Sequence, residues 1–326
     1  MGGPAFQRNQ LEEPVAGLGY ILRRVALMVP TLVVILVVTF VIVRSLPGDP
    51  ASAMIGDRAT DKDAARINAE LGLDRSLPVQ FFLFVGRVAS GDLGTSFSIK
   101  LPVSEVIVDR LPATLILTAM AAVFALLLAV PLAFVAAMKR NRVEDVAIRG
   151  FFQVGLSMPV FYTGLVLLTV LGAGLHWFPV GGYGDDFLSH LYHLFLPALA
   201  IAVTLAAILM RNLRSAIIAV LDADYLDFAR SKGLANHVIL LRHVLRNAFI
   251  STVTLLGLHI GTVIGSAVIT ETVFAIPGIG RLMIDSIYAR DYPMVQGLTL
   301  VLALLVSVIF LATDLIQAAL DPRIAR

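Results

Sequence analysis

Residues 20–43 read YILRRVALMVPTLVVILVVTFVIV and are soon followed by the sequence LPGDP, which begins at Leu46. A helix needs about 20 predominantly apolar residues to cross the hydrocarbon core of a bilayer. Proline lacks a backbone N–H and clashes with the preceding turn, so the helix is expected to end before this cluster. The run predicts a membrane-spanning helix. The apolar core of a cleaved signal peptide has about 15 residues at most. This run is longer, so we expect an uncleaved anchor.

Five further apolar runs of similar length follow, at 112–138, 150–174, 194–218, 250–273 and 295–317. Pro112 is expected near the start of the second helix, where a missing N–H costs nothing. The chain is 58% apolar and 15% charged, whereas soluble domains carry about 25% charged residues. With a mean hydropathy of +0.88, an ordinary soluble protein is excluded. We predict an all-α integral membrane protein with six transmembrane helices.

The distribution of lysine and arginine predicts the orientation, because cytoplasmic loops of membrane proteins carry an excess of both. Fifteen of these residues lie near the two termini and in 139–149 and 211–246, whereas the opposite short loops, 175–193 and 274–294, hold two. Both termini are therefore expected in the cytoplasm. The chain has no cysteine, which excludes disulfides and zinc–thiolate sites.

The spans divide the chain into segments with different surroundings. We expect a cytoplasmic tail at 1–19, the first transmembrane helix at 20–43, a periplasmic (extracytoplasmic) segment at 44–111, a core transmembrane domain at 112–319 and a cytoplasmic tail at 320–326. The core domain contains a long cytoplasmic loop at 219–249.

The 44–111 segment is too long to be a simple connector. Its sequence predicts a helix near 61–72, which Gly72 would end, and a second apolar run at 79–89 that is too short to cross a membrane. Two interpretations stay open for this segment: a small folded cap over the outer mouth, or a lid that contacts the substrate.

The loop at 219–249 is basic and amphipathic. Asp222 or Asp224 is expected to cap a helix that runs to Lys232, and Gly233 then permits a sharp turn. A second helix would follow, with apolar residues at helical spacing: Val238, Leu241, Leu245 and Phe249. The pattern predicts a protruding knob of two short helices, although an interfacial helix with snorkelling cations fits the spacing equally well.

Several stretches in the same order resemble one family over about residues 20–324. They are RSLPGDPA, LGLDRSLPVQFFLFVGRVASGDLGTSF, LSMPVFYTGL, DYLDFARSKGL, LLRHVLRNA, ETVFAIPGIGRLMIDSIYARDYPMVQG and DPRI. The chain is similar to the permease subunit of bacterial ATP-binding-cassette (ABC) importers, and within it to the branch that imports dipeptides, oligopeptides, glutathione or nickel. The resemblance implies the type I ABC importer fold.

In that family the 219–249 loop is the coupling loop, which docks on an ATPase subunit through an acidic residue, two small residues and a later glycine. These fall on Asp227, Phe228, Ala229 and Gly233; Phe228 departs from the small-residue pattern, and Asp227 stands where glutamate is usual. Ser251 stands where the family often has proline. The resemblance implies ATPase contacts by Tyr225, Asp227, Phe228, Ala229, Arg230, Lys232, Gly233, Leu234, Val238, Leu241 and Arg242.

The fifth predicted span carries two patterns. Glycines recur every four residues, at Gly257, Gly261 and Gly265, which predicts close packing on a neighbouring helix. Polar residues lie on the opposite side and predict a water-accessible translocation path: Thr252, His259, Thr262, Ser266 and Thr270. The alternative is that the hydroxyl groups bond to carbonyls of their own helix. His259 lies near mid-membrane, where an ionisable residue suggests function.

The outer loop at 274–294 predicts a turn around Pro277 and Gly278, followed by a short helix along the mouth. The resemblance implies that this loop meets a substrate-loaded binding protein. The candidate docking residues are Asp285, Arg290, Asp291 and Tyr292, and the alternative is that these polar groups are only solvated.

The chain has no GxxxxGK[ST] phosphate-binding motif, so it is not expected to bind ATP itself. Carboxylates lie only toward the span ends, at Glu271 and Asp314, which argues against an ion-driven secondary transporter. An HxxH pair, His190 and His193, is not expected to bind metal, and no polar cluster suggests an intramembrane enzyme.

The resemblance therefore implies a non-catalytic permease subunit of an importer for short peptides in the bacterial inner membrane. Its partners would be a homologous second permease, two ATPase subunits that bind ATP and Mg, an extracytoplasmic binding protein and membrane lipid, with no cofactor in this chain. Nickel, glutathione or an opine-like solute is the alternative cargo, because the binding protein largely selects it.

Overall fold

The computed structural model describes residues 18–45, 75–223 and 244–320, together with a few positions between 231 and 239. The elements in these ranges are helical: α1 (Leu18–Ser45), α4 (Leu77–Ala89), α5 (Val103–Met138), α6 (Val143–Ser157), α7 (Val160–Leu167), the π-helix η1 (Leu168–Gly174), α8 (Phe187–Leu221), α11 (Arg246–Val273), α12 (Ile279–Tyr288) and α13 (Tyr292–Leu320). The helix expected near 61–72 lies outside the described residues.

Five of the six predicted spans are continuous helices that are long and apolar enough to cross a membrane: α1, α5, α8, α11 and α13. The predicted third span is broken instead. Its two parts, α6 and α7 with η1, meet at 105°. The break falls at Met158 and Pro159, because proline cannot continue the hydrogen-bond ladder and its predecessor favours extended backbone.

The second span also differs from expectation. Helix α5 begins at Val103, so Pro112 lies inside it and not near its start. The ring is tolerated there because neighbouring groups in a helix bundle can satisfy the carbonyl that it leaves without a donor. The extra turns carry Val106 and Ile107 into a second apolar cluster with Ile279 and Met294 at the outer mouth.

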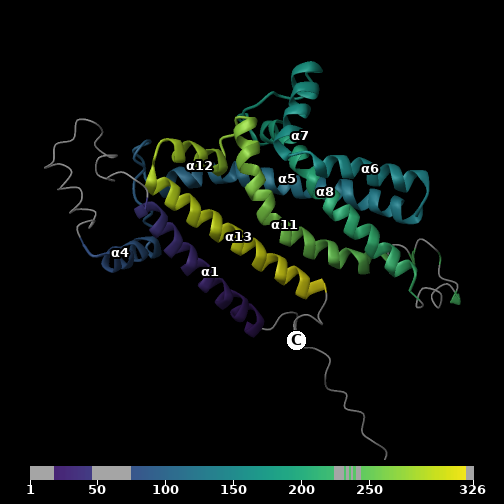
Figure 1. The fold of residues 1–326 in the computed structure, drawn as a ribbon, viewed down its shortest axis with the longest axis horizontal. Helices are drawn as coiled ribbons and strands as arrows, with labels where there is room; N and C mark the ends of the chain where they lie inside the picture. The colour runs from purple at the N-terminus through teal and green to yellow at the C-terminus, as the bar shows by residue number, and fades with distance from the viewer. Residues whose placement is uncertain are drawn as a thin grey trace, which may run out of the picture.

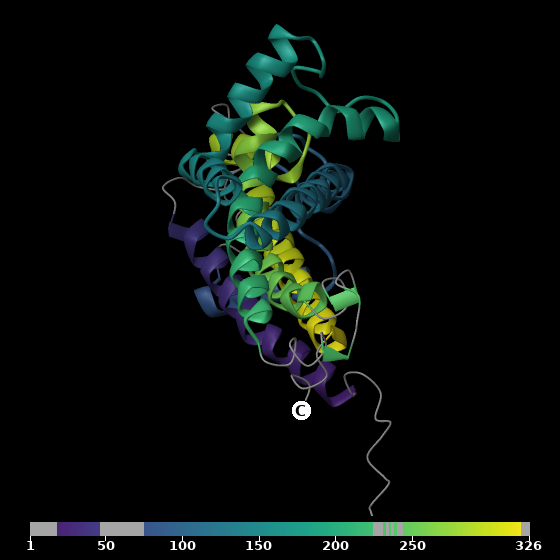
Figure 2. The ribbon, with the colours of Figure 1, turned by 90° about the vertical axis from the view of Figure 1, so that its right-hand side faces the viewer.

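Helix α8 forms the centre of the molecule, because it packs against α5, α6, α7 and α11 (Figures 1 and 2). Its contact with α5 is close because α5 presents a buried small residue every four positions: Ala113, Ala121, Ala125, Ala129, Ala133 and Ala137, with Leu117 between the first two. Small side chains allow two helix backbones to approach each other in a membrane.

Helices α1 and α13 lie side by side along one flank of the molecule (Figure 1). An ion pair between Arg24 and Asp314, with 3.0 Å between Nη1 and Oδ2, joins them. Helix α4, the apolar run predicted too short to span, packs the rings of Phe81 and Phe84 on Phe40 of α1. The short α12 crosses the outer mouth between α11 and α13, as the sequence of the outer loop predicts.

Candidate functional site: the transport path and its two ends

The polar residues of α11 do not share one environment. Thr252 and Thr270 are buried within the chain, His259 and Ser266 are half-buried, and Thr262 is exposed. Hydroxyl groups bond to carbonyls of their own helix: Thr262 to His259 at 2.6 Å, Ser266 to Thr262 at 2.9 Å and Thr270 to Ser266 at 2.9 Å. Within this chain only the central part of the expected stripe is therefore accessible, and the path remains a prediction.

The three glycines of α11 also lie in different environments. A Cβ on Gly257 would collide with Thr313 of α13, and one on Gly261 would touch Val306 and Phe310 of the same helix. Gly265 has no atom within 4 Å of its Cβ position and is exposed. Within this chain the close contacts made at Gly257 and Gly261 do not extend to Gly265.

Gly265 belongs to an exposed face of α11 instead. Leu258, Thr262 and Ile269 are exposed with it, and their spacing of three or four residues places all four on one side of the helix. This exposed α11 face (residues 258, 262, 265 and 269) presents apolar, hydroxyl and backbone surface together. It is the side of the fifth span that this chain leaves uncovered.

At the outer end of α11, Glu271 is buried and holds three helices together. Its Oε1 accepts the hydroxyl of Thr114 in α5 at 2.5 Å, and its Oε2 accepts the backbone N–H of Arg281 in the first turn of α12 at 2.9 Å. The N–H groups at a helix N-terminus stabilise a negative charge. Glu271 lies toward the end of its span, as expected, and it is buried in the core there.

The buried carboxylate of Glu271 explains why the turn before α12 contains glycines. A Cβ on Gly278 would collide with the Glu271 carboxylate, and one on Gly280 would lie 2.5 Å from the Cα of Val268. Only glycine allows the turn to approach α11 this closely. The IPGIG sequence is thus explained by packing on a buried acid.

A second buried carboxylate, Asp291, fixes the loop before α5 to the start of α13. Its Oδ2 accepts the hydroxyl groups of Ser96 at 2.5 Å and Ser98 at 2.8 Å, and the Ser98 N–H at 3.0 Å. Burial raises the pKa of this carboxyl group, but the hydrogen bonds from Ser96 and Ser98 outweigh it, so the pKa lies below its usual value.

Two of the four docking candidates are part of this arrangement. Asp291 and Tyr292 are buried, so neither presents a surface to a partner in this conformation. Asp285 and Arg290 are exposed at the outer mouth, and Asp285 forms a loose pair with Arg281 at 3.8 Å.

At the opposite end of the bundle, Asp145 is fully buried in the first turn of α6. Arg214 of α8 binds both its carboxylate oxygens, at 2.7 and 2.6 Å, and Arg149 adds a bond of 3.2 Å. The backbone N–H of Asn141 in the α5–α6 turn also donates to it, at 2.9 Å. Asp145 was not predicted as a site residue from the sequence. The signal that could have found it is an acidic residue in the first turn of a helix, with arginines nearby in the sequence.

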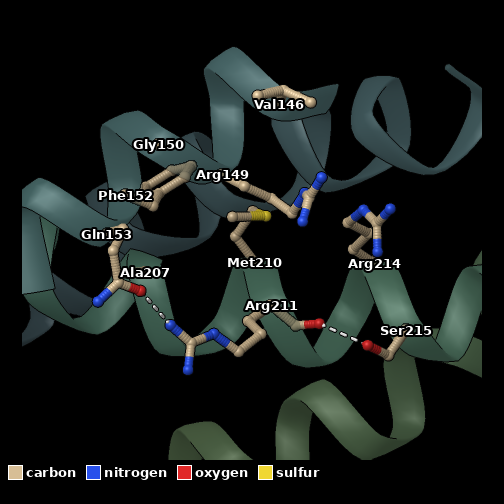
Figure 3. Close-up of a pocket in the computed structure, with 10 residues that line it drawn as sticks. All are labelled: Val146, Arg149, Gly150, Phe152, Gln153, Ala207, Met210, Arg211, Arg214 and Ser215. Carbon is tan, nitrogen blue, oxygen red and sulfur yellow. Dashed lines mark hydrogen bonds between the residues drawn. The ribbon is translucent and has the colours of Figure 1, made fainter. Parts of the chain in front are cut away.

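Beside this network lies a pocket of about 630 Å³ between α6 and α8 (Figure 3). Arg149 and Arg214 point toward one another at one end, and Arg211 lies with Gln153, its Nη2 2.8 Å from Oε1 of Gln153. The remaining lining is mostly apolar or small: Val146, Gly150, Phe152, Ala207, Met210 and Ser215.

The coupling loop falls largely outside the described residues, including Tyr225, Asp227, Phe228, Ala229, Arg230, Gly233, Leu234, Leu241 and Arg242. Of the expected contacts, Lys232 is exposed and Val238 is half-buried. Where α8 ends, Asp222 accepts a hydrogen bond from Arg140 of the α5–α6 turn at 3.1 Å. The base of the loop is therefore tied to the same turn that Asp145 holds.

The two histidines of the HxxH pair bond to backbone, His190 to the Tyr183 carbonyl and His193 to that of Ser189, each at 2.8 Å. No group of three potential metal ligands occurs within the part of the chain that the structure describes.

Comparison with known proteins gives a consistent result along the chain. A family model described as "Binding-protein-dependent transport system inner membrane component" matches residues 129–326, and the N-terminal model of such membrane components matches 17–118. The dipeptide transport system permease protein DppB of Escherichia coli K12 is 36% identical over 334 residues, with 94% of this chain and 98% of DppB covered.

The glutathione transport system permease protein GsiC of Salmonella typhimurium is 38% identical over 307 residues, with 94% of this chain and 99% of GsiC covered. Among solved structures, the inward-facing MetNI methionine ABC transporter superposes with a TM-score of 0.54 at 17% identity, over 66% of this chain and 96% of that chain. The predicted fold class, a helical ABC importer membrane subunit, is confirmed.

Proposed function

Because the chain belongs to the family of binding-protein-dependent transport system inner membrane components, we propose that it forms half of the translocation path of an ATP-driven importer for short peptides. The observation that carries the proposal is the likeness to a dipeptide permease over 94% of the chain. The family model for the inner membrane component matches residues 129–326, a range that contains the 219–249 loop. Glutathione is the second candidate cargo, because GsiC is similar to the same extent. Nickel and opine-like solutes have no comparable support.

The uncovered side of the fifth span supports a paired path. A homologous second permease would face the exposed α11 face, so that Thr262, with Ser266 and His259 beside it, borders a water-accessible passage between the two subunits. The glycine at 265 leaves room for a solute or for a partner helix at that level. An ion-driven carrier is disfavoured, since Glu271 of α11 and Asp314 of α13 are both engaged by other residues.

The energy for transport would come from partner subunits. Two ATPase subunits, with ATP and Mg bound to them and no cofactor in this chain, would dock on the coupling loop on the cytoplasmic side, where both termini also lie. Their closure would shift the population between inward- and outward-facing states, because each state makes different contacts. A binding protein would deliver the peptide at the outer mouth, where Asp285 and Arg290 are exposed.

The test is uptake of a labelled dipeptide by cells whose own copy of this chain is deleted. We expect the wild-type chain to restore uptake, and Gly233→Pro to abolish it while the subunits still assemble in the membrane and still hydrolyse ATP. Gly86→Ala is the control, since a Cβ there has open space and the position lies in α4, outside the coupling loop. Restored uptake by Gly233→Pro would contradict the coupling role, and uptake driven by an ion gradient in the purified chain alone would contradict the importer.

A further inference from the structure

The pocket between α6 and α8 has an excess of positive charge that the network around Asp145 does not neutralise. Arg149, Arg211 and Arg214 line it, and Asp145 is the one carboxylate bound to these side chains in the described part of the chain. Two other basic side chains nearby are already paired: Lys139 with Glu144 and Arg140 with Asp222, both at 3.1 Å. Three guanidinium groups against one carboxylate leave two positive charges facing the pocket.

The donors are arranged for an anion with several oxygens. Figure 3 shows Arg149 and Arg214 directed toward one another at one end of the pocket. Arg211 is exposed, and its side chain has a neutral partner, the amide oxygen of Gln153. Guanidinium groups bind phosphate with paired N–H groups and are weakly hydrated, so they give up water readily to such a ligand.

The surroundings of the pocket are apolar rather than aqueous. Phe152 and Met210 form part of its wall, and Val146, Phe151 and Val154 of α6 are each more than half exposed. A free phosphate ester would use the arginines but not this apolar surface. A lipid would use both, with its headgroup in the pocket and its acyl chains along α6.

We propose that this pocket binds the phosphate headgroup of an anionic phospholipid. On the orientation predicted from lysine and arginine, the site lies in the cytoplasmic leaflet, whose anionic lipids are attracted to basic pockets between transmembrane helices. The bound lipid would seal α6 against α8 beside the Asp145 network. This site is separate from the path for cargo.

The experiment is native mass spectrometry of the delipidated full-length chain in detergent, titrated with phosphatidylglycerol or with phosphatidylcholine of the same acyl chains. We expect the wild-type chain to prefer phosphatidylglycerol. Each pocket arginine near the headgroup should contribute about fivefold in affinity. The double variant Arg149→Gln/Arg211→Gln should therefore bind phosphatidylglycerol about 25-fold more weakly, while Arg214 remains to hold Asp145.

The matched control is Arg142→Gln. Arg142 is an exposed arginine at the start of α6 that does not line the pocket. It should change affinity less than twofold. A second pair avoids removing any arginine: a side chain at Gly150 has open space, so Gly150→Glu should repel the headgroup and Gly150→Gln should not.

Equal binding of the two lipids would overturn the proposal, as would equal losses in the double variant and in Arg142→Gln, or identical affinities of Gly150→Glu and Gly150→Gln. Full displacement of phosphatidylglycerol by excess inorganic phosphate would show an anion site without a lipid contribution, and would also overturn it. Partial displacement with retained preference supports the lipid.

Discussion

The guanidinium group of Arg214 holds both carboxylate oxygens of Asp145, at 2.7 and 2.6 Å, and so joins α8 to the first turn of α6. Two-point binding fixes the relative orientation of the two helices as well as their separation. Arg140 and Asp222 repeat the link a few residues away, at the end of α8. The α5–α6 turn, the first turn of α6 and the end of α8 are therefore linked to one another at the base of the 219–249 loop.

Asp145→Asn should destabilise the chain strongly. The change leaves Arg214 and Arg149 without a counter-charge, and breaking a buried ion pair in this way costs about 3 to 5 kcal/mol. Thermal unfolding in detergent, followed by circular dichroism, measures the loss. Glu144→Gln is the control, since its pair with Lys139 is exposed and should contribute less than about 1 kcal/mol. Equal effects of the two changes would contradict the assignment.

Gly280→Ala should destabilise the outer mouth. The new Cβ would lie 2.5 Å from the Cα of Val268, a backbone atom that cannot move aside, and overpacking of this kind costs about 1 to 3 kcal/mol. The same unfolding assay applies. Gly86→Ala in α4, where nothing lies within 4 Å of the new Cβ, should be neutral or stabilising by up to about 1 kcal/mol. A neutral Gly280→Ala would contradict the contact.

Asp291→Asn should lower stability in a pH-dependent way. The pKa of Asp291 is depressed in the folded chain, so its carboxylate stabilises the fold above the unfolded pKa of about 3.9, and this contribution is lost as the pH falls through the folded pKa. The difference in unfolding temperature between wild type and variant should be full at pH 7 and shrink below about pH 4.

The control for that measurement is Asp285→Asn, because Asp285 is exposed and its pair with Arg281 is loose. Its unfolding temperature should stay close to that of the wild type at both pH values. A gap between wild type and Asp291→Asn that stays constant down to acid pH would refute the role of the charged form.

The absence of cysteine permits a direct test of the path. In the assembled importer, Thr262→Cys should react with a membrane-impermeant maleimide faster than Leu304→Cys on α13, although both positions are exposed in the single chain. Water reaches a path but not the lipid-facing side of a span. Thr252→Cys, buried in this chain, should react slowest. Equal rates at Thr262→Cys and Leu304→Cys would place the exposed α11 face in lipid.

Much of the fold follows from local signals in the sequence. Apolar length alone locates α1, α11 and α13 to within a few residues, because a bilayer demands about 20 apolar residues from any helix that crosses it. Helix α8 begins at Phe187, well before the expected run at 194–218. The same signal cannot reveal the 105° break at Pro159, since both halves are apolar and prolines also occur in unbroken helices such as α5.

The candidate sites were harder to predict because they depend on contacts between distant segments. Asp291 and Glu271 look like surface acids in the sequence, and their partners Ser96 and Thr114 lie 195 and 157 residues away. The alanines that recur every four residues in α5 were not recognised from the sequence, because such a period indicates a packing face only once α8 is in place. The exposed α11 face likewise emerges from what α13 leaves uncovered.

The broken third span has a mechanical consequence. Its first half, α6, is joined to α8 by the ion pair between Asp145 and Arg214. The second half, α7 with η1, is separated from α6 by Met158 and Pro159, and proline cannot continue the helical hydrogen bonds. The outer half contacts the same helix separately, since the Cβ position of Gly164 in α7 lies 3.8 Å from Ala200 of α8. One span thus meets α8 at two places through two segments that share no continuous hydrogen-bond ladder.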